Sequence, residues 1–322
     1  MAFTFAPMQM ERSAAVLDPV GCAPYEVNGP RGAPAVVVLG GISATRHVAS
    51  GEVDGTPGWW EHVVGRARAI DTSRHCVVGM DFLDGGSGDD GRPARIVTTL
   101  DQADALARTL DTLGIDRLHA LVGASYGGMV ALAFAARYPD RVARLVVISA
   151  AHEPHPMTTA VRSVQRRIVE LGLASGRTHE TLAIARELAM TTYRSPREFR
   201  ERFASAASAI DGSSASFPVE SYLRHHGERF AAAWQPARFL ALSLSADLHR
   251  IAPGDVRTPT VLVAAEDDAV IPRTQLEQLA HDIAAPTRLL DIHTSTGHDA
   301  FLTEPDQLTR ILHPVLENPE FP

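Results

Sequence analysis

The sequence predicts an α/β fold in which a mostly parallel sheet is flanked by helices and interrupted by an inserted helical lid. Short apolar runs alternate with helical patterns over residues 1–150, an order typical of a parallel sheet with right-handed crossovers. The alternation stops over residues 151–254, where helical patterns continue without a convincing buried strand. It resumes over residues 255–322. We therefore expect a sheet domain built from the first and last segments, with the middle segment as its lid.

Four apolar runs in the first segment are expected to form strands of the sheet. Runs without polar alternation are typical of strands whose two faces are both covered by helices. One helix is expected to end at Gly114, with Thr99 and Gln102 forming a capping box at its start, and an Ala-rich helix should cover Val130–Tyr138. The residues before Pro34 are compatible with an edge hairpin. The four expected strands are Ala35–Leu39, His75–Phe82, Leu118–Val122 and Arg144–Ser149.

Apolar residues at helical spacing predict three helices in the lid, and the last segment returns to alternating strands and helices. The lid helices are expected over Val161–Leu171, Leu182–Thr192 and Val219–Trp234. The last segment is expected to contain the strands Thr260–Ala264 and Thr287–Ile292 and the helices Gln275–Ile283 and Gln307–Leu312.

Composition and charge favour a cytoplasmic enzyme that acts on small molecules. The chain has 322 residues, of which 45% are hydrophobic, so it can bury a large core. A net charge of −8 without a Lys/Arg block argues against a nucleic-acid partner. The two cysteines, Cys22 and Cys76, provide neither a disulfide framework nor a metal site, and Cys76 is expected in the core. No secretion signal or membrane-spanning run is apparent.

The stretch Gly123-Ala124-Ser125-Tyr126-Gly127 is a G-x-S-x-G motif between an expected strand and an expected helix. Glycines let the two backbones approach closely, so the serine is left in a strained turn with its hydroxyl above the sheet. The helix that follows directs N–H groups and its positive dipole end toward an anion formed there. We predict that Ser125 is a nucleophile; the alternative is a glycine-rich strand–helix turn with an inert serine.

A serine hydroxyl needs a base to accept its proton, and the base is usually oriented by a carboxylate. In α/β-hydrolases the order along the chain is serine, acid, histidine. His298 follows the last expected strand, and Asp267 and Asp268 follow the strand before it, so all three should lie at one sheet edge. The residues alone do not separate the two aspartates.

Two backbone N–H groups are predicted to form an oxyanion hole. In α/β-hydrolases one donor comes from the residue after the nucleophile and the other from the loop after an earlier strand. These positions are Tyr126 and, in the loop Gly40-Gly41-Ile42-Ser43-Ala44, Ile42.

With these features the chain resembles the homoserine O-acyltransferases of the α/β-hydrolase superfamily. The similarity extends from Val36 to Leu302, and the last three of its motifs are much more specific than G-x-S-x-G, because ordinary esterases have no reason to share them. The motifs are Gly58-Trp59-Trp60 with Ala69-Ile70-Asp71-Thr72, Ser125-Tyr126-Gly127-Gly128-Met129, Thr192-Tyr193-Arg194-Ser195, Val219-Glu220-Ser221-Tyr222-Leu223 and Gly297-His298-Asp299-Ala300-Phe301-Leu302.

The resemblance implies specific roles for several residues. Its Asp-x-x-x-Pro pattern falls on Asp268, which favours this residue as the acid of a Ser125–His298–Asp268 triad. The family's homoserine-binding Arg and Tyr fall on Arg186 and Tyr193, and its ligand for the substrate ammonium falls on Asp299. A guanidinium is suited to a substrate carboxylate because it can bind both oxygens.

The resemblance also implies acyl-CoA as co-substrate, no bound cofactor or metal, a place in methionine biosynthesis, and a homodimer. The oxyanion loop and Tyr126 depart from acetyl-type members, which favours succinyl-CoA over acetyl-CoA as the donor. Arg46 is the candidate partner for the free succinyl carboxylate. The alternatives are a homoserine O-acetyltransferase, a serine O-acyltransferase, an esterase or thioesterase, and a non-catalytic binding protein.

Overall fold

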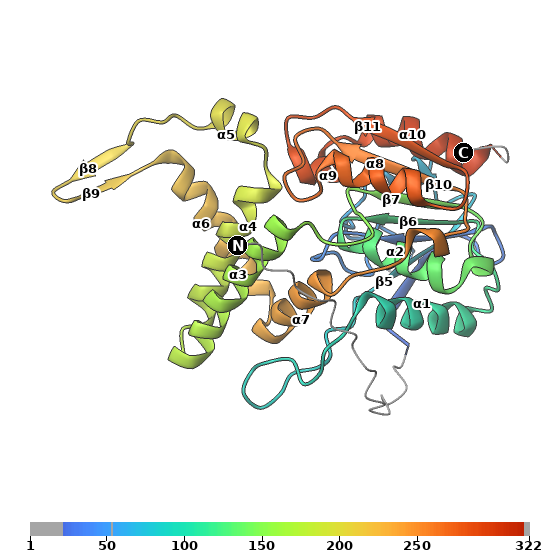
Figure 1. Cartoon of the computed structure of the whole chain (residues 1–322), viewed down its shortest axis with the longest axis horizontal. Coiled ribbons are helices and arrows are strands. Elements are labelled where there is room, and N and C mark those ends of the chain that lie inside the picture. The colour runs from blue at the N-terminus through green and yellow to red at the C-terminus, as the bar shows by residue number, and fades with distance from the viewer. Residues whose placement is uncertain (1–21, 53, 319–322) are drawn as a thin grey trace, which may run out of the picture.

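The structure, a computed structural model, describes residues 22–52 and 54–318 and contains a seven-stranded sheet at its centre (Figure 1). Six neighbouring strands are parallel, and the edge strand β1 pairs antiparallel with β5. The α/β fold class predicted from the sequence is thus confirmed. In sheet order the strands are β1 (Tyr25–Asn28), β5 (Cys76–Met80), β2 (Ala35–Leu39), β6 (Ala120–Ala124), β7 (Leu145–Ile148), β10 (Thr260–Ala265) and β11 (Thr287–Ile292).

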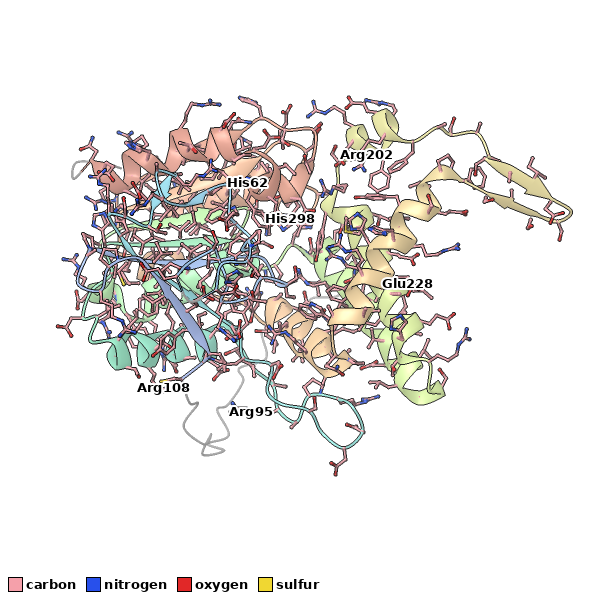
Figure 2. All side chains as sticks on the ribbon, turned by 180° about the vertical axis from the view of Figure 1, so that it is seen from behind. His62, Arg95, Arg108, Arg202, Glu228 and His298 are labelled. Carbon is pink, nitrogen blue, oxygen red and sulfur yellow. The ribbon has the colours of Figure 1, made fainter. Side chains whose placement is uncertain are left out.

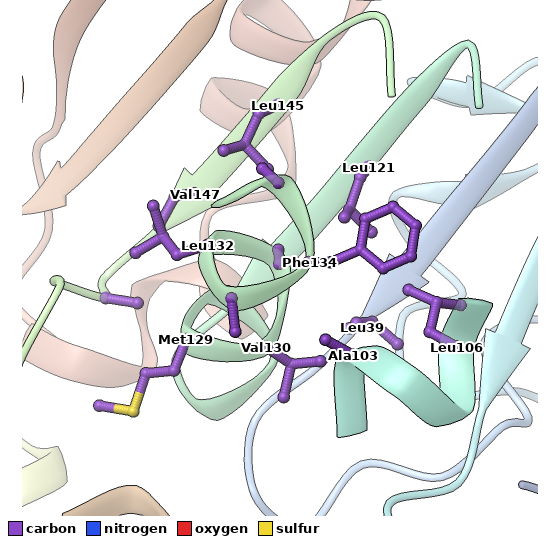
Figure 3. Close-up of a cluster of buried hydrophobic side chains, with 14 of the residues drawn as sticks. Leu39, Ala103, Leu106, Leu121, Met129, Val130, Leu132, Phe134, Leu145 and Val147 are labelled. Atoms are coloured by element: carbon purple, nitrogen blue, oxygen red, sulfur yellow. The ribbon is translucent and has the colours of Figure 1, made fainter. Parts of the chain in front are cut away.

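Helices cover both faces of the sheet, because successive strand residues point to opposite sides. Val37 and Leu39 pack into one core with α1 (Thr99–Leu113), α2 (Tyr126–Arg137) and α8 (Arg273–Asp282). Val36 and Val38 pack into a second core with α10 (Pro305–Glu317) and with a loop segment that contains Trp60. Figure 3 shows the first core, where Phe134 of α2 lies against Leu121 and Leu106. Cys76 is buried there, as predicted.

The segment between β7 and β10 is mainly helical and has a small core of its own. In Figure 1 it lies to one side of the sheet, and its hairpin extends away from the body. Val169, Leu182 and Leu240 are among the buried residues of its core. The elements are α3 (Pro156–Ser175), α4 (Thr178–Tyr193), α5 (Pro196–Arg202), β8 (Ala209–Asp211), β9 (Ser214–Ser216), α6 (Pro218–Ala233) and α7 (Pro236–Asp247).

Short elements complete the described chain. They are β3 (Val64–Gly65), β4 (Ile70–Asp71), α9 (Ala300–Thr303) and the 3₁₀ turns η1 (Pro139–Arg141), η2 (Pro253–Asp255) and η3 (Gly297–Asp299). Across the described ranges, no helix has the length and apolar character that crossing a membrane requires. Those ranges also contain no cluster of His, Cys, Asp and Glu suited to a metal ion.

One local prediction was wrong, and two helices of the lid were not predicted. The capping box of α1 uses Thr98 and Asp101, because Gln102 is buried and binds the backbone of Leu83 instead. Gly114 does end this helix, with φ 69°. The expected edge hairpin falls mostly on residues outside the described ranges and stays a prediction; within those ranges β1 pairs with β5. Helices α5 and α7 were not predicted; most of α7 is buried, so its sequence lacks the polar face that marks an amphipathic helix.

Candidate active site

Ser125 lies between β6 and α2 in a strained backbone conformation, with φ 52° and ψ −121°. Such a φ is uncommon for a residue with a side chain and typical of functional turns. The neighbouring glycines allow it: a Cβ on Gly123 would lie 2.4 Å from the carbonyl oxygen of Gly127. A Cβ on Gly127 would lie 2.4 Å from the carbonyl oxygen of Leu39. The close approach predicted for these two glycines is therefore present.

The structure brings Ser125, His298 and Asp268 together in one hydrogen-bonded row. Ser125 Oγ lies 2.8 Å from His298 Nε2. His298 Nδ1 lies 2.9 Å from Asp268 Oδ2 and 3.0 Å from Oδ1. Asp267 points elsewhere, with its carboxylate 3.6 Å from Arg197. This geometry suits proton transfer from the serine hydroxyl to the imidazole.

The surroundings of His298 and Asp268 favour an ion pair when the imidazole takes up a proton. Both side chains are buried. Burial alone would lower the pKa of His298, but the Asp268 carboxylate outweighs it, so the pKa is raised. Asp268 also accepts hydrogen bonds from the N–H groups of Val270 and Ile271, each at 2.9 Å, which fix its orientation.

The predicted oxyanion donors flank the serine. Ile42 and Tyr126 both line a cavity that contains Ser125 and His298. Within the described residues, neither the Ile42 N–H nor the Tyr126 N–H donates a hydrogen bond to another group. Two N–H groups without partners beside a nucleophile can stabilise the anion of a tetrahedral intermediate.

Arg186, Tyr193 and Asp299 lie together in a cavity beside Ser125 and His298, here called the acceptor cavity. The Arg186 guanidinium is 5.3 Å from the centre of the Tyr193 ring, which is itself 5.6 Å from the His298 ring. Arg186 has no ion-pair partner in the part of the chain that the structure describes. Its charge is therefore available to a bound carboxylate.

Asp299 provides the opposite charge in the acceptor cavity. Its Oδ2 is 3.3 Å from Arg194 Nε. Burial raises the pKa of Asp299, and the positive charges of Arg194, His298 and Arg186 oppose this shift. The cavity thus presents one cation and one anion at its wall, a pattern that matches the two charged ends of an amino acid.

A second cavity, here called the acyl cavity, meets the acceptor cavity at Ser125, Ile42, Tyr193 and His298. Its wall is mainly apolar, and its cation is Arg162 of α3. Arg162 Nε and Arg166 Nη1 each lie 2.6 Å from a different oxygen of Asp247, which is buried. Two guanidinium groups share one carboxylate, so the cluster keeps a net positive charge. Figure 2 shows His298 where this helical segment meets the sheet.

Comparisons with known proteins identify the family of the chain. Residues 34–305 match the family with the alpha/beta hydrolase fold. The chain is 43% identical to a homoserine O-succinyltransferase of Xanthomonas campestris pv. campestris, over 89% of this chain and 77% of that protein. The chain belongs to the homoserine O-acyltransferase family.

Other members and one solved structure extend this comparison. An L-serine/homoserine O-acetyltransferase of Streptomyces lavendulae is 35% identical over 84% of each chain. The crystal structure of a homoserine O-acetyltransferase from Bacillus anthracis aligns with a TM-score of 0.82 over 91% of each chain. At 19% identity this last similarity concerns the fold alone. The family predicted from the sequence motifs is confirmed.

Arg46, which the sequence suggested as the partner of the succinyl carboxylate, lines neither cavity. Its guanidinium is 2.5 Å from Asp81 and its backbone N–H binds the same carboxylate, so its side chain is directed to Asp81 rather than into a cavity. Sequence reasoning missed Arg162, which lines the acyl cavity instead. The signal was weak, because an arginine in an amphipathic lid helix resembles any surface arginine.

Proposed function

We propose that the protein is an L-homoserine O-succinyltransferase, which moves a succinyl group from succinyl-CoA to the homoserine hydroxyl in methionine biosynthesis. One observation carries this proposal: two cavities meet at Ser125 and His298, one lined by Arg186 and Asp299 and the other by Arg162. Acyl-CoA acts as a co-substrate, and the reaction needs no bound cofactor or metal. The 43% identity to a homoserine O-succinyltransferase supports the same conclusion.

In the first half-reaction Ser125 becomes acylated. His298 Nε2 accepts the hydroxyl proton while Ser125 Oγ attacks the thioester carbonyl carbon. The N–H groups of Ile42 and Tyr126 stabilise the resulting oxyanion. The carbon–sulfur bond then breaks, His298 returns the proton to the sulfur, and CoA leaves an acyl-serine.

In the second half-reaction homoserine accepts the acyl group. Arg186 binds its carboxylate, Asp299 binds its ammonium, and Tyr193 packs beside them. These contacts place the side-chain hydroxyl at the acyl-serine, where His298 removes its proton. The hydroxyl oxygen attacks the ester carbon, the bond to Ser125 breaks, and Ser125 recovers its proton from His298.

Arg162 supports succinyl-CoA as the donor. A succinyl thioester has a free carboxylate, whereas an acetyl thioester has none. Arg162 lines the mainly apolar acyl cavity, and behind it Arg162 and Arg166 share the single carboxylate of Asp247. The remaining positive charge suits a succinyl carboxylate and gives an acetyl group no matching partner.

The proposal is tested by incubating the enzyme with succinyl-CoA, with and without L-homoserine. We expect CoA release to depend on homoserine and O-succinylhomoserine to form in equal amount. Free succinate at a rate that homoserine does not change would indicate a thioesterase. Faster turnover with acetyl-CoA or with L-serine would assign a different donor or acceptor.

A homodimer formed through α3 completes the proposal. Met157, Val161, Val164, Ile168 and Leu171 alternate at intervals of four and three residues along this helix, and this row is here called the α3 seam. Met157 is 65% exposed and Leu171 is 68% exposed. Met157 and Val161 also line the acyl cavity and Ile168 packs against the lid core, so the outward part of the α3 seam is centred on Val164 and Leu171. Exposed apolar side chains along one side of a helix are typical of a helix that packs against a second copy of itself.

A further inference from the structure

We propose that Ser195 and Arg197 of the lid are positioning residues that hold the loop bearing His298 against Ser125. The pair and its contacts with residues 294–296 are here called the lid latch. The inference rests on the proposed role of His298 as the base, but not on the identity of the acyl donor or acceptor.

Ser195 is fully buried and joins the lid to the histidine loop through backbone and side chain. Its N–H donates to the carbonyl of Thr296 at 3.1 Å, and its hydroxyl donates to the carbonyl of Ser295. The same hydroxyl accepts a hydrogen bond from the Glu198 N–H at 3.0 Å, which caps α5. One side chain therefore fixes the start of a lid helix and the loop that leads to His298.

Arg197 makes the second half of the lid latch. Its guanidinium donates to the carbonyl of Thr294. It also lies 3.5 Å from Glu266 and 3.6 Å from Asp267, which directly precede Asp268. Arg197 therefore connects the loop that carries the histidine with the loop that carries its carboxylate partner.

The histidine loop is also held from the sheet side. Trp60 Nε1 donates to the carbonyl of Phe301 at 2.7 Å, after His298 in the chain. The lid latch acts before His298, so the short turn η3 is restrained at both ends. A displacement of about 1 Å at a reacting group can reduce a rate by about 100-fold, so these restraints bear directly on the Ser125–His298 contact.

The lid latch also connects the acceptor cavity with the loop that carries His298. Tyr193 lies two positions before Ser195, and Asp299 lies directly after His298. Arg194, between Tyr193 and Ser195, pairs with Asp299. Contacts from one short stretch of the lid thus reach both the residues proposed to bind homoserine and the loop of the histidine.

The test measures how fast a fluorophosphonate probe modifies Ser125, because this reaction needs neither acyl-CoA nor homoserine. Ser125 Oγ forms a bond to phosphorus, the phosphorus–fluorine bond breaks, fluoride leaves, and His298 takes the proton. We expect Ser195→Ala and Arg197→Ala to lower the rate constant at least about tenfold. Arg197→Lys keeps a donor for Thr294 and should recover most of the loss.

Arg200→Ala is the matched control, since Arg200 is an exposed arginine on the same helix. It should label within about twofold of the wild type. A kinetic control separates positioning from folding: in the Arg197→Ala enzyme kcat with succinyl-CoA should fall while KM for succinyl-CoA stays constant. If Arg197→Ala and folded Ser195→Ala label at the wild-type rate, the proposal is wrong. If the variants label slowly as expected but the wild-type enzyme transfers no succinyl group, only the proposed function is contradicted.

Discussion

In the proposed mechanism, the protonation state of His298 decides whether Ser125 can react. The imidazole must be neutral to accept the serine proton. Burial opposes its protonation, but Asp268 at 2.9 Å raises its pKa overall. The raised pKa means that His298 becomes protonated, and therefore inactive as a base, at a higher pH than an ordinary histidine.

Asp268→Asn should move the acid limb of kcat/KM to lower pH. The substitution removes the charge that raises the pKa of His298 and leaves burial, which lowers it. The maximal rate should also fall, by about 10⁴-fold in analogous triads, because the imidazole loses its orientation. A pH profile from pH 5 to 9 measures both effects. An acid limb that stays in place would contradict the assignment of Asp268.

Arg162→Met should lower kcat/KM for succinyl-CoA by about 10- to 100-fold, the value of a hydrogen bond to a charged group. Acetyl-CoA turnover should change little, because an acetyl group has no carboxylate to lose. Asp247 keeps Arg166 as its partner, so the variant leaves no buried carboxylate unpaired. Arg46→Met is the matched control and should keep the wild-type donor preference. An equal loss of kcat/KM for succinyl-CoA and acetyl-CoA would show that Arg162 does not bind the succinyl carboxylate.

At the scale of elements, His249 joins helix α1 to the segment after β7. Its Nδ1 lies 2.8 Å from the Thr99 hydroxyl and its Nε2 lies 3.1 Å from the Ala151 carbonyl. A carbonyl can only accept, so the proton is on Nε2 and the neutral ring accepts from Thr99. Burial lowers the pKa of His249 to about 3.

The buried His249 should make the protein less stable in acid. Between pH 6.5 and about pH 3 the unfolded chain binds a proton at His249 and the folded chain does not. The free energy of unfolding should therefore fall as the pH drops below 6.5, by at most about 1.4 kcal/mol per pH unit from this residue. Urea unfolding at pH 7 and pH 5 measures it. His249→Gln should have a lower free energy of unfolding than the wild type at pH 7 but should lose less of it between pH 7 and pH 5. An equal loss in both proteins would contradict the role of His249.

Elements with a strong local signal could be predicted from sequence. The buried strands were found because continuous apolar runs need cover on both faces, and the turn around Ser125 was found because only glycine permits its backbone contacts. Arg162 and α7 were missed because their signals are tertiary. The role of Arg162 depends on which face of α3 meets the sheet, and α7 is buried on most sides.

At the scale of the whole molecule, the lid has a task that the sheet cannot perform. The sheet supplies Ser125, Asp268 and His298, while the segment between β7 and β10 supplies Arg162 and Arg186. In the proposed reaction the lid thus provides the two arginines that bind substrate carboxylates, while the loop after β11 provides Asp299 for the substrate ammonium. In the proposed reaction the lid would also shield the acyl-serine from water, which a transferase requires.

The α3 seam should make the protein a dimer. Leu171→Asp places a charge in the seam and should convert the dimer to a monomer, as measured by sedimentation equilibrium at tens of micromolar protein. Ile210→Asp is the control, because Ile210 is 78% exposed on the hairpin outside the seam. A monomeric wild type, or a dimer that both variants leave intact, would contradict the interface.

The most direct test of the account is the intact mass of the enzyme after exposure to succinyl-CoA alone, followed by peptide mapping. We predict a mass increase of one succinyl group, located on Ser125, which disappears when L-homoserine is added and O-succinylhomoserine forms. Ser125→Ala should acquire no such group. Transfer of a succinyl group to homoserine by the Ser125→Ala enzyme, or a succinyl group on a different residue, would contradict acyl transfer through Ser125.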